Sequence, residues 1–240
     1  MDFLFTISLL LPLVISGNKS HQPYNRLFED LMNKYNRLVR PVENPNNTIN
    51  IEFKLHLGML VDVQEKVQVL TTNGWLYHRW FDPRLRWNPK EYGGVTDIHI
   101  PGEMLWLPDI ILYNNAHGSP SVSSITKALV SSDGTVTWMA PVIYDSFCNI
   151  DIEWYPYDIQ ECELKFGSWT YSGTQLNLIH PRSDNVVLKM KGQEQTWRVE
   201  EGVDLSAYQE SVEWDLLSVD GTRHEKWYPC CDYPYPLKSH

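Results

Sequence analysis

The sequence predicts an all-β fold, an antiparallel immunoglobulin-like β-sandwich with one N-terminal α-helix. Between Ile49 and Val69, apolar residues occupy nearly every odd position, which is the period of a strand with one face on a core. Turn signals then recur along the rest of the chain. Aromatic residues are abundant, with 10 Trp, 13 Tyr and 7 Phe, and they favour strands over helices.

The first 17 residues predict a signal peptide. The apolar run from Phe3 to Ile15 is shorter than the roughly 20 residues that a membrane helix needs, and small residues follow it. Asp2 precedes the run where a basic residue is usual. We therefore expect export through the secretory pathway, with residues 18–240 forming one domain.

The next stretch, Pro23 to Pro41, has apolar residues at helical spacing and predicts one amphipathic helix that ends at Pro41. The alternating stretch from Ile49 to Val69 predicts one very long strand, or two strands joined by a bulge. Turn signals follow at 72–74 (TNG), 82–84 (DPR), 92–94 (YGG), 133–134 (DG), 172–173 (SG) and 220–221 (DG).

Several classes of function are disfavoured. A formal net charge of −10 argues against binding to nucleic acid or to an anionic membrane surface, because both require basic patches. The chain has no nucleophile elbow, no phosphate-binding glycine loop and no zinc-protease motif, and its histidines are scattered. We expect no catalytic residues, no metal and no cofactor.

Four cysteines in an exported chain favour disulfides. Cys148 and Cys162 enclose thirteen residues, and a bridge between them leaves Cys230 and Cys231 with each other. The other two pairings require two strands to converge on the adjacent cysteines. Three other interpretations of Cys230 and Cys231 remain open: two free thiols, half of a metal site, or a disulfide that only staples a surface turn. N-glycosylation sequons start at Asn18 and Asn46.

Three motifs occur together in a fixed order: the enclosed loop with its Pro-x-Asp centre, the sequence SWTY at 168–171 and the adjacent cysteines. In this combination the chain, from about Pro23 to Pro236, resembles the extracellular ligand-binding domain of pentameric Cys-loop receptors. The resemblance is specifically to alpha-type subunits of nicotinic acetylcholine receptors. It implies a Cys230–Cys231 disulfide in a loop that closes over agonist.

The resemblance also implies two sets of ligand-binding residues. The principal face comprises Tyr113, Trp169, Tyr171, Tyr228, Cys230, Cys231 and Tyr235. The complementary face, contributed by the neighbouring subunit, comprises Trp75, Leu129, Thr137, Met139 and Asp204. A quaternary ammonium donates no hydrogen bond, so aromatic rings suit it, and Trp169 is the expected ring beneath it. The implied ligand is acetylcholine or a nicotine-like amine, and the implied partners are homologous subunits in a homomeric or heteromeric pentamer.

Departures from the family pattern bear on these expectations. The loop centre reads YPYD at 155–158, where phenylalanines are usual, and the acidic partner of Lys165 on a late strand is missing. A final strand and four membrane helices would follow Pro236. A complete subunit would lie on the extracellular face of the plasma membrane, and membrane contact would come only through that missing part.

Two alternatives compete with the receptor interpretation. One is a secreted acetylcholine-binding or decoy protein, which needs the same aromatic cage without a pore. The other is a secreted β-sandwich lectin whose exposed tryptophans stack on sugars. The order of the motifs argues against the lectin, because sugar stacking does not explain it.

Overall fold

The computed structural model describes residues 22–122, 125–181, 187–191, 194–199, 201–227 and 234–235. The predicted signal peptide and the sites at Asn18, Tyr228, Cys230 and Cys231 lie outside the described residues. Of Tyr235 only the backbone is described.

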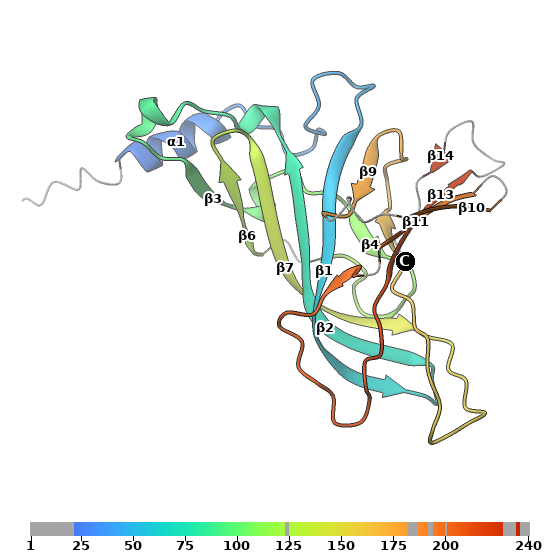
Figure 1. The fold of residues 1–240 in the computed structure, drawn as a ribbon. Helices are drawn as coiled ribbons and strands as arrows, with labels where there is room; N and C mark the ends of the chain where they lie inside the picture. The colour runs from blue at the N-terminus through green and yellow to red at the C-terminus, as the bar shows by residue number, and fades with distance from the viewer. Residues whose placement is uncertain are drawn as a thin grey trace, which may run out of the picture.

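The described residues form a β-sandwich with one N-terminal helix, which confirms the predicted fold class (Figure 1). The larger layer is an eight-stranded sheet in the order β12-β1-β2-β7-β6-β3, with β9 also beside β1 and β5 also beside β7. Its strands are β1 (Ile49–Gln64), β2 (Val69–Phe81), β3 (Asp97–Pro101), β5 (Asn115–His117), β6 (Lys127–Ser131), β7 (Thr135–Phe147), β9 (Leu176–Ile179) and β12 (Val203–Asp204).

The remaining strands form two smaller sheets. One pairs β4 (Ile110–Leu112) with β8 (Phe166–Ser168). The other contains β10 (Val187–Lys191), β11 (Glu194–Val199), β13 (Gly221–Trp227) and β14 (Pro234–Tyr235). Among the described strand pairs, β1–β9 and β1–β12 are parallel and the others are antiparallel. Neither parallel pair is sequential, because each connects β1 to a strand much later in the chain.

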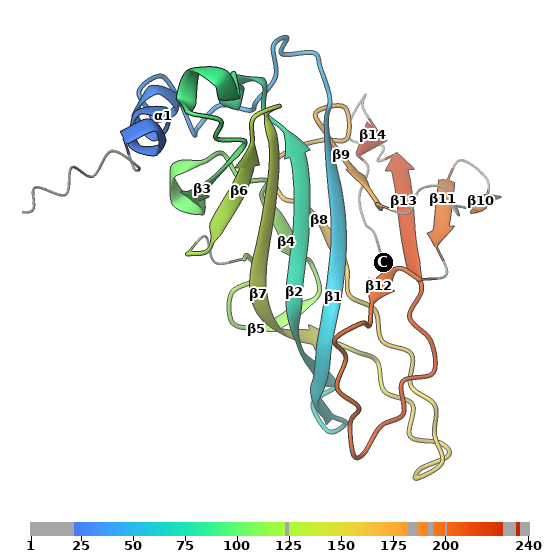
Figure 2. The same cartoon turned by 60° about the vertical axis from the view of Figure 1, so that its left-hand side comes forward.

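The core lies between the large sheet and the β4–β8 pair, which Figure 2 shows behind β1, β2 and β7. Phe166 of β8 joins the two layers, because its ring centroid lies 5.2 Å from that of Phe53 on β1 and 5.7 Å from that of Tyr144 on β7. All three side chains are buried. Burying a large apolar side chain of this kind stabilises the fold by about 1.5–3 kcal/mol.

Strand β1 follows the predicted alternation only as far as Leu57. Register shifts lie between Leu57 and Met59 and again between Leu60 and Asp62. Because each shift changes the face on which the following residues lie, Met59 is 38% exposed and Leu60 packs on a second small cluster. The bulge prediction is confirmed, but the prediction that odd positions face the core is wrong for Met59, Val61 and Val67, which are 38%, 49% and 50% exposed.

The turn predicted at residues 72–74 is also wrong, because these residues lie inside β2. Gly74 pairs with Leu57, and a Cβ atom there would lie 2.2 Å from the carbonyl oxygen of His56. The glycine therefore reflects close approach of β1 and not a turn. The turns predicted at 92–94 and 133–134 are confirmed by positive φ values of Gly93, Gly94 and Gly134.

Helix α1 (Gln22–Met32) is shorter than predicted. Leu27 and Leu31 are buried beneath it, but Leu38, expected on the same face, is 82% exposed. The chain past the helix is held by Tyr35, whose hydroxyl donates to the buried Asp82 at 2.8 Å. This side-chain anchor replaces the helical turns expected up to Pro41.

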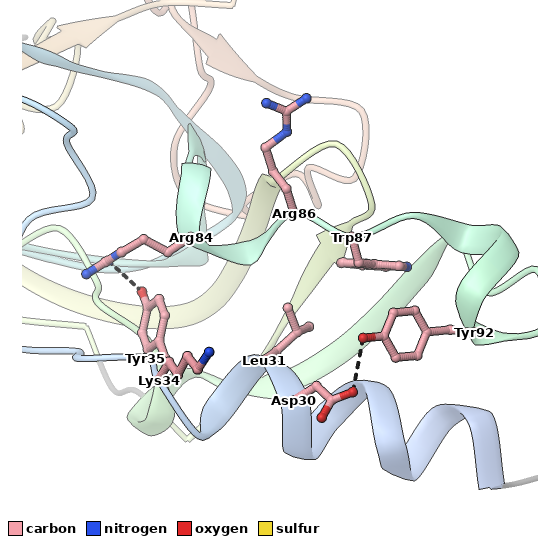
Figure 3. Close-up of a pocket in the computed structure, with 8 residues that line it drawn as sticks. All are labelled: Asp30, Leu31, Lys34, Tyr35, Arg84, Arg86, Trp87 and Tyr92. Atoms are coloured by element: carbon pink, nitrogen blue, oxygen red, sulfur yellow. Dashed lines mark hydrogen bonds between the residues drawn. The ribbon is translucent and has the colours of Figure 1, made fainter.

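Asp82 caps the first of the three short 3-10 helices among the described residues: η1 (Pro83–Leu85), η2 (Pro89–Tyr92) and η3 (Gly102–Met104). A cavity of about 330 Å³ lies between α1 and the η1–η2 segment (Figure 3). At its edges Arg84 donates to the Tyr35 hydroxyl at 3.1 Å, and Tyr92 donates to Asp30 at 3.0 Å. The Tyr92 bond attaches the helix, and the Arg84 bond attaches the segment after it, to the end of the sandwich opposite the loop 148–162 (Figure 1).

Candidate functional site

Trp169 lies directly after β8 and is 71% exposed. Its backbone N–H donates to the carbonyl oxygen of Asp109 at 3.2 Å, which ties the residue to the segment before β4. Tryptophan carries the largest apolar surface of any residue and is highly buried on average. An indole that is held by its backbone and left in solvent is therefore suited to contact another molecule.

The carboxylate of Asp109 fixes the loop that carries Trp169. It accepts a hydrogen bond from the Ser168 hydroxyl at 2.5 Å and another from the Thr170 N–H at 2.7 Å. Because both neighbours of Trp169 are bonded to one side chain, the backbone of Trp169 is held on both sides. The sequence motifs did not single out Asp109, although an Asp after a Pro at the start of a strand is a typical loop-fixing residue.

Tyr113 lies beside Trp169. Its ring centroid lies 5.9 Å from that of the indole, with 39° between the ring planes. The Tyr113 hydroxyl donates to the carbonyl oxygen of Ser168 at 2.6 Å, and its N–H donates to the carbonyl oxygen of Lys165 at 2.7 Å. These two bonds link the loop after β4 to both ends of β8.

Asn114, next to Tyr113, joins three segments of chain and was also missed by the sequence analysis. Its amide nitrogen donates to the carbonyl oxygens of Phe147 at 3.0 Å and Glu163 at 2.7 Å. Its amide oxygen accepts from the N–H of Lys165 at 3.0 Å. Asn114 therefore holds the Tyr113 loop against the end of β7 and the segment after Cys162.

Tyr171 has different neighbours. Its ring centroid lies 6.2 Å from that of Trp106, and the guanidinium carbon of Arg40 lies 5.8 Å above the ring. The side chain is half-buried and packs on the main core. These contacts place its ring against the sandwich, and its membership of an aromatic cage stays a prediction.

The predicted complementary residues share the outer face of the large sheet. Trp75 lies on β2, Leu129 on β6, and Thr137 and Met139 on β7. Leu129 pairs with Thr137, and Met139 pairs with Tyr77. Tyr77 therefore lies within this set, although the sequence analysis did not select it. Asp204 lies on β12 at the edge of the same sheet.

Charged groups flank Trp75 on this face. Lys54 donates to the carboxylate of Asp204 at 2.6 Å, and His56 Nδ1 lies 3.6 Å from the same oxygen. The hydrogen bond from Lys54 holds the pKa of Asp204 well below its ordinary value, and bonds from Ser206 lower it further. Burial lowers the pKa of His56, and Asp204 opposes that shift.

The large sheet separates the two predicted sets of residues. The β4–β8 pair, whose flanking loops carry Tyr113 and Trp169, packs on the inner face of this sheet through Phe166. Trp75 and Met139 lie on its outer face.

The disulfide between Cys148 and Cys162 is present, as predicted, with Cα atoms 5.0 Å apart. Beyond it, Lys165 pairs with Glu163 at 2.7 Å, so a nearby acid takes the place of the expected partner on a late strand. Asn46 is exposed, as a glycosylation site requires. The pairing of Cys230 with Cys231 lies outside the described residues and stays a prediction.

The described part of the chain contains no helix that is both long and apolar enough to cross a membrane. Within the same residues, no group of three or more His, Cys, Asp or Glu side chains could hold a metal ion.

Comparison with known proteins agrees with these observations. Residues 24–238 match the family model described as "Neurotransmitter-gated ion-channel ligand binding domain". The chain is 47% identical over 242 residues to "Acetylcholine receptor subunit alpha-type unc-63" of Caenorhabditis elegans, covering 98% of this chain and 48% of that protein. It is 46% identical over 228 residues to "Acetylcholine receptor subunit alpha-like 2" of Drosophila melanogaster, covering 95% and 38%.

A mammalian relative, "Neuronal acetylcholine receptor subunit alpha-2" of Rattus norvegicus, is 43% identical over 229 residues, covering 95% of this chain and 41% of the relative. The chain thus spans less than half the length of each of these relatives. The matching family consists of receptor domains and not of enzymes. The fold, the disulfide-closed loop and these matches together show that the chain belongs to the family of neurotransmitter-gated ion-channel ligand-binding domains.

Proposed function

We propose that this domain binds acetylcholine or a related amine and that, in a longer subunit, binding opens a cation channel. The similarity to alpha-type acetylcholine receptor subunits supports the ligand. The observation that carries the proposal is the pairing of Tyr113 with an exposed Trp169 on a loop fixed by Asp109.

The chemistry of this pair suits a quaternary ammonium. Such a cation has no N–H to donate, so it gains most from the negative faces of aromatic rings, at about 0.5–2 kcal/mol per ring. The Tyr113 hydroxyl already donates to a backbone carbonyl. The ring of Tyr113 and the indole of Trp169 are therefore the groups that meet the ammonium.

The rest of the site comes from two further sources. Tyr228 and Tyr235, with the Cys230–Cys231 disulfide between them, close the cage from the same chain. Trp75, Leu129, Thr137 and Met139 of a neighbouring subunit cover the other side, with Asp204 at the edge of that set. This arrangement requires a ring of homologous subunits, a pentamer, displayed on the extracellular face of the plasma membrane.

The test is titration of the assembled protein with acetylcholine while tryptophan fluorescence is recorded. We expect acetylcholine to quench the fluorescence of the wild-type protein, and Trp169→Ala to abolish the change. Trp154→Ala is the matched control, because Trp154 is also 71% exposed but lies in the loop 148–162. A folded wild-type assembly whose fluorescence does not change on addition of acetylcholine contradicts the proposal. An equal loss of quenching in Trp169→Ala and Trp154→Ala contradicts it as well.

A further inference from the structure

Trp75 is stacked against a histidine on the neighbouring strand. β1 and β2 pair with His56 directly opposite Trp75. The two ring centroids lie 5.5 Å apart, and the ring planes differ by only 10°. Directly opposed residues are the nearest cross-strand neighbours in an antiparallel pair. The imidazole therefore covers one face of the indole and limits the angles that the indole can adopt.

The space around Trp75 limits the indole in a second way. A Cβ atom on Gly58 would lie 3.6 Å from the six-membered ring of Trp75. The indole thus extends along β1, from His56 toward Gly58. A larger side chain at position 58 would occupy the space beside the ring.

His56 is itself held from its other side. β12 pairs with β1 so that Asp204 lies beside His56, and one carboxylate oxygen of Asp204 lies 3.6 Å from His56 Nδ1. The same oxygen accepts from Lys54 at 2.6 Å, and the other accepts from the Ser206 N–H at 2.9 Å. Both oxygens of Asp204 are therefore engaged within the chain.

These contacts bear on how Asp204 takes part in ligand binding. Its charge is neutralised by Lys54, whose side chain is only 12% exposed. Releasing Asp204 to an approaching ammonium would leave Lys54 without its partner in a largely buried position, which is costly. Asp204 is better placed to hold His56 than to contact a cation.

We propose that His56 is a positioning residue for Trp75 and that Asp204 acts on the ligand only through His56. The proposal rests on the proposed function, because Trp75 meets ligand only in the assembled site. On this account the complementary half contacts the uncharged part of the ligand, and recognition of the ammonium is left to the face that carries Trp169.

The first test needs no ligand. The full chain is labelled with 5-fluorotryptophan, and the Trp75 fluorine resonance is assigned with Trp75→Phe. We expect His56→Ala to shift and broaden this resonance, and His56→Phe, which keeps a flat ring, to restore one narrow signal. His117→Ala, an exposed histidine on β5, is the matched control and leaves the resonance unchanged. A Trp75 signal that is the same in wild type and His56→Ala overturns the proposal.

The second test is a double-mutant cycle on the acetylcholine Kd of the assembled protein. We expect His56→Ala to raise the Kd about fivefold, in line with the loss of one aromatic pair, and His56→Phe to restore it. Asp204→Asn should raise the Kd of the wild type but not that of His56→Ala, since coupled residues are non-additive. An equal effect of Asp204→Asn in both backgrounds shows direct contact with ligand and overturns the proposal.

The two tests also separate this proposal from the proposed function. If the Trp75 resonance responds as expected but the assembled protein binds no acetylcholine, the proposed function fails and the positioning role stands. If acetylcholine binds but the resonance does not respond to His56→Ala, the positioning role fails and the proposed function stands.

Discussion

Asp109 shows how a single carboxylate can hold an exposed aromatic side chain in place. Its two oxygens accept hydrogen bonds from the residues before and after Trp169, so the backbone that carries the exposed indole is held on both sides. Hydrogen bonds to a charged group contribute about 1.5–3 kcal/mol each. The sequence motifs predicted Trp169 and Tyr113, but not Asp109 or Asn114, because a polar residue that fixes a loop looks like any other polar loop residue until its partners are known.

At this scale we predict that Asp109→Asn weakens acetylcholine binding by about tenfold, the lower end of the range for losing a charge-assisted bond. The matched control is Asp133→Asn, because Asp133 also accepts from a hydroxyl and an N–H, those of Thr135, in the turn before β7. Both Kd values are measured by isothermal titration calorimetry on folded, assembled protein. An unchanged Kd for Asp109→Asn would show that the loop holds Trp169 without this carboxylate.

At the scale of elements, periodicity predicted the strands well and their local irregularities poorly. The alternation from Ile49 to Leu57 places one face of β1 on the core, and any one-sided strand shows that pattern. The register shifts after Leu57 and the close approach at Gly74 depend on the partner strand. The helix ends at Met32 for a similar reason, because Tyr35 bonds to Asp82, which lies 47 residues away in the sequence.

The approach at Gly74 gives a prediction for stability. Gly74→Ala places a methyl group 2.2 Å from the His56 carbonyl oxygen, so the two strands must separate. We expect a loss of about 2 kcal/mol or more in the free energy of unfolding, as for other overpacked sites. Gly94→Ala is the control, because its Cβ meets nothing within 4 Å and only its φ of 86° causes strain, at about 1–2 kcal/mol. Urea unfolding monitored by circular dichroism should give Gly74→Ala a lower free energy of unfolding than Gly94→Ala. The reverse order would show that the close approach of β1 does not limit the side chain at position 74.

At the scale of the whole molecule, the sandwich both builds the core and keeps the two predicted halves of the site apart. The resemblance to a receptor family supplied both sets of residues, but not the sheet that lies between them. The position of each set depends on which face of the sheet it occupies, and hence on strand pairing across the whole chain. The same packing buries His78 completely, between Trp138 and Phe53.

Burial lowers the pKa of His78 to about 3, below the unfolded value of about 6.5. Between these values the unfolded chain binds a proton that the folded chain does not. The free energy of unfolding should therefore be fully present above pH 6.5 and fall as the pH is lowered from 6.5 towards 3, by about 4 kcal/mol at most.

His78→Leu should remove this component and flatten the dependence on pH between 6.5 and 4, whereas His117→Leu, at an exposed position on β5, should keep the wild-type slope. Urea unfolding at a series of pH values measures both. Equal slopes for wild type and His78→Leu would show that protonation of His78 does not govern acid stability.

Fluorinating the indole of Trp169 shows directly whether an ammonium lies on that ring. One, two and three fluorine atoms on Trp169 withdraw progressively more of the negative charge from its face, which is what attracts a cation. We expect the acetylcholine Kd to rise stepwise with each fluorine at Trp169 and to stay constant for the same series at Trp154. An acetylcholine Kd that does not change along the Trp169 series would contradict this expectation.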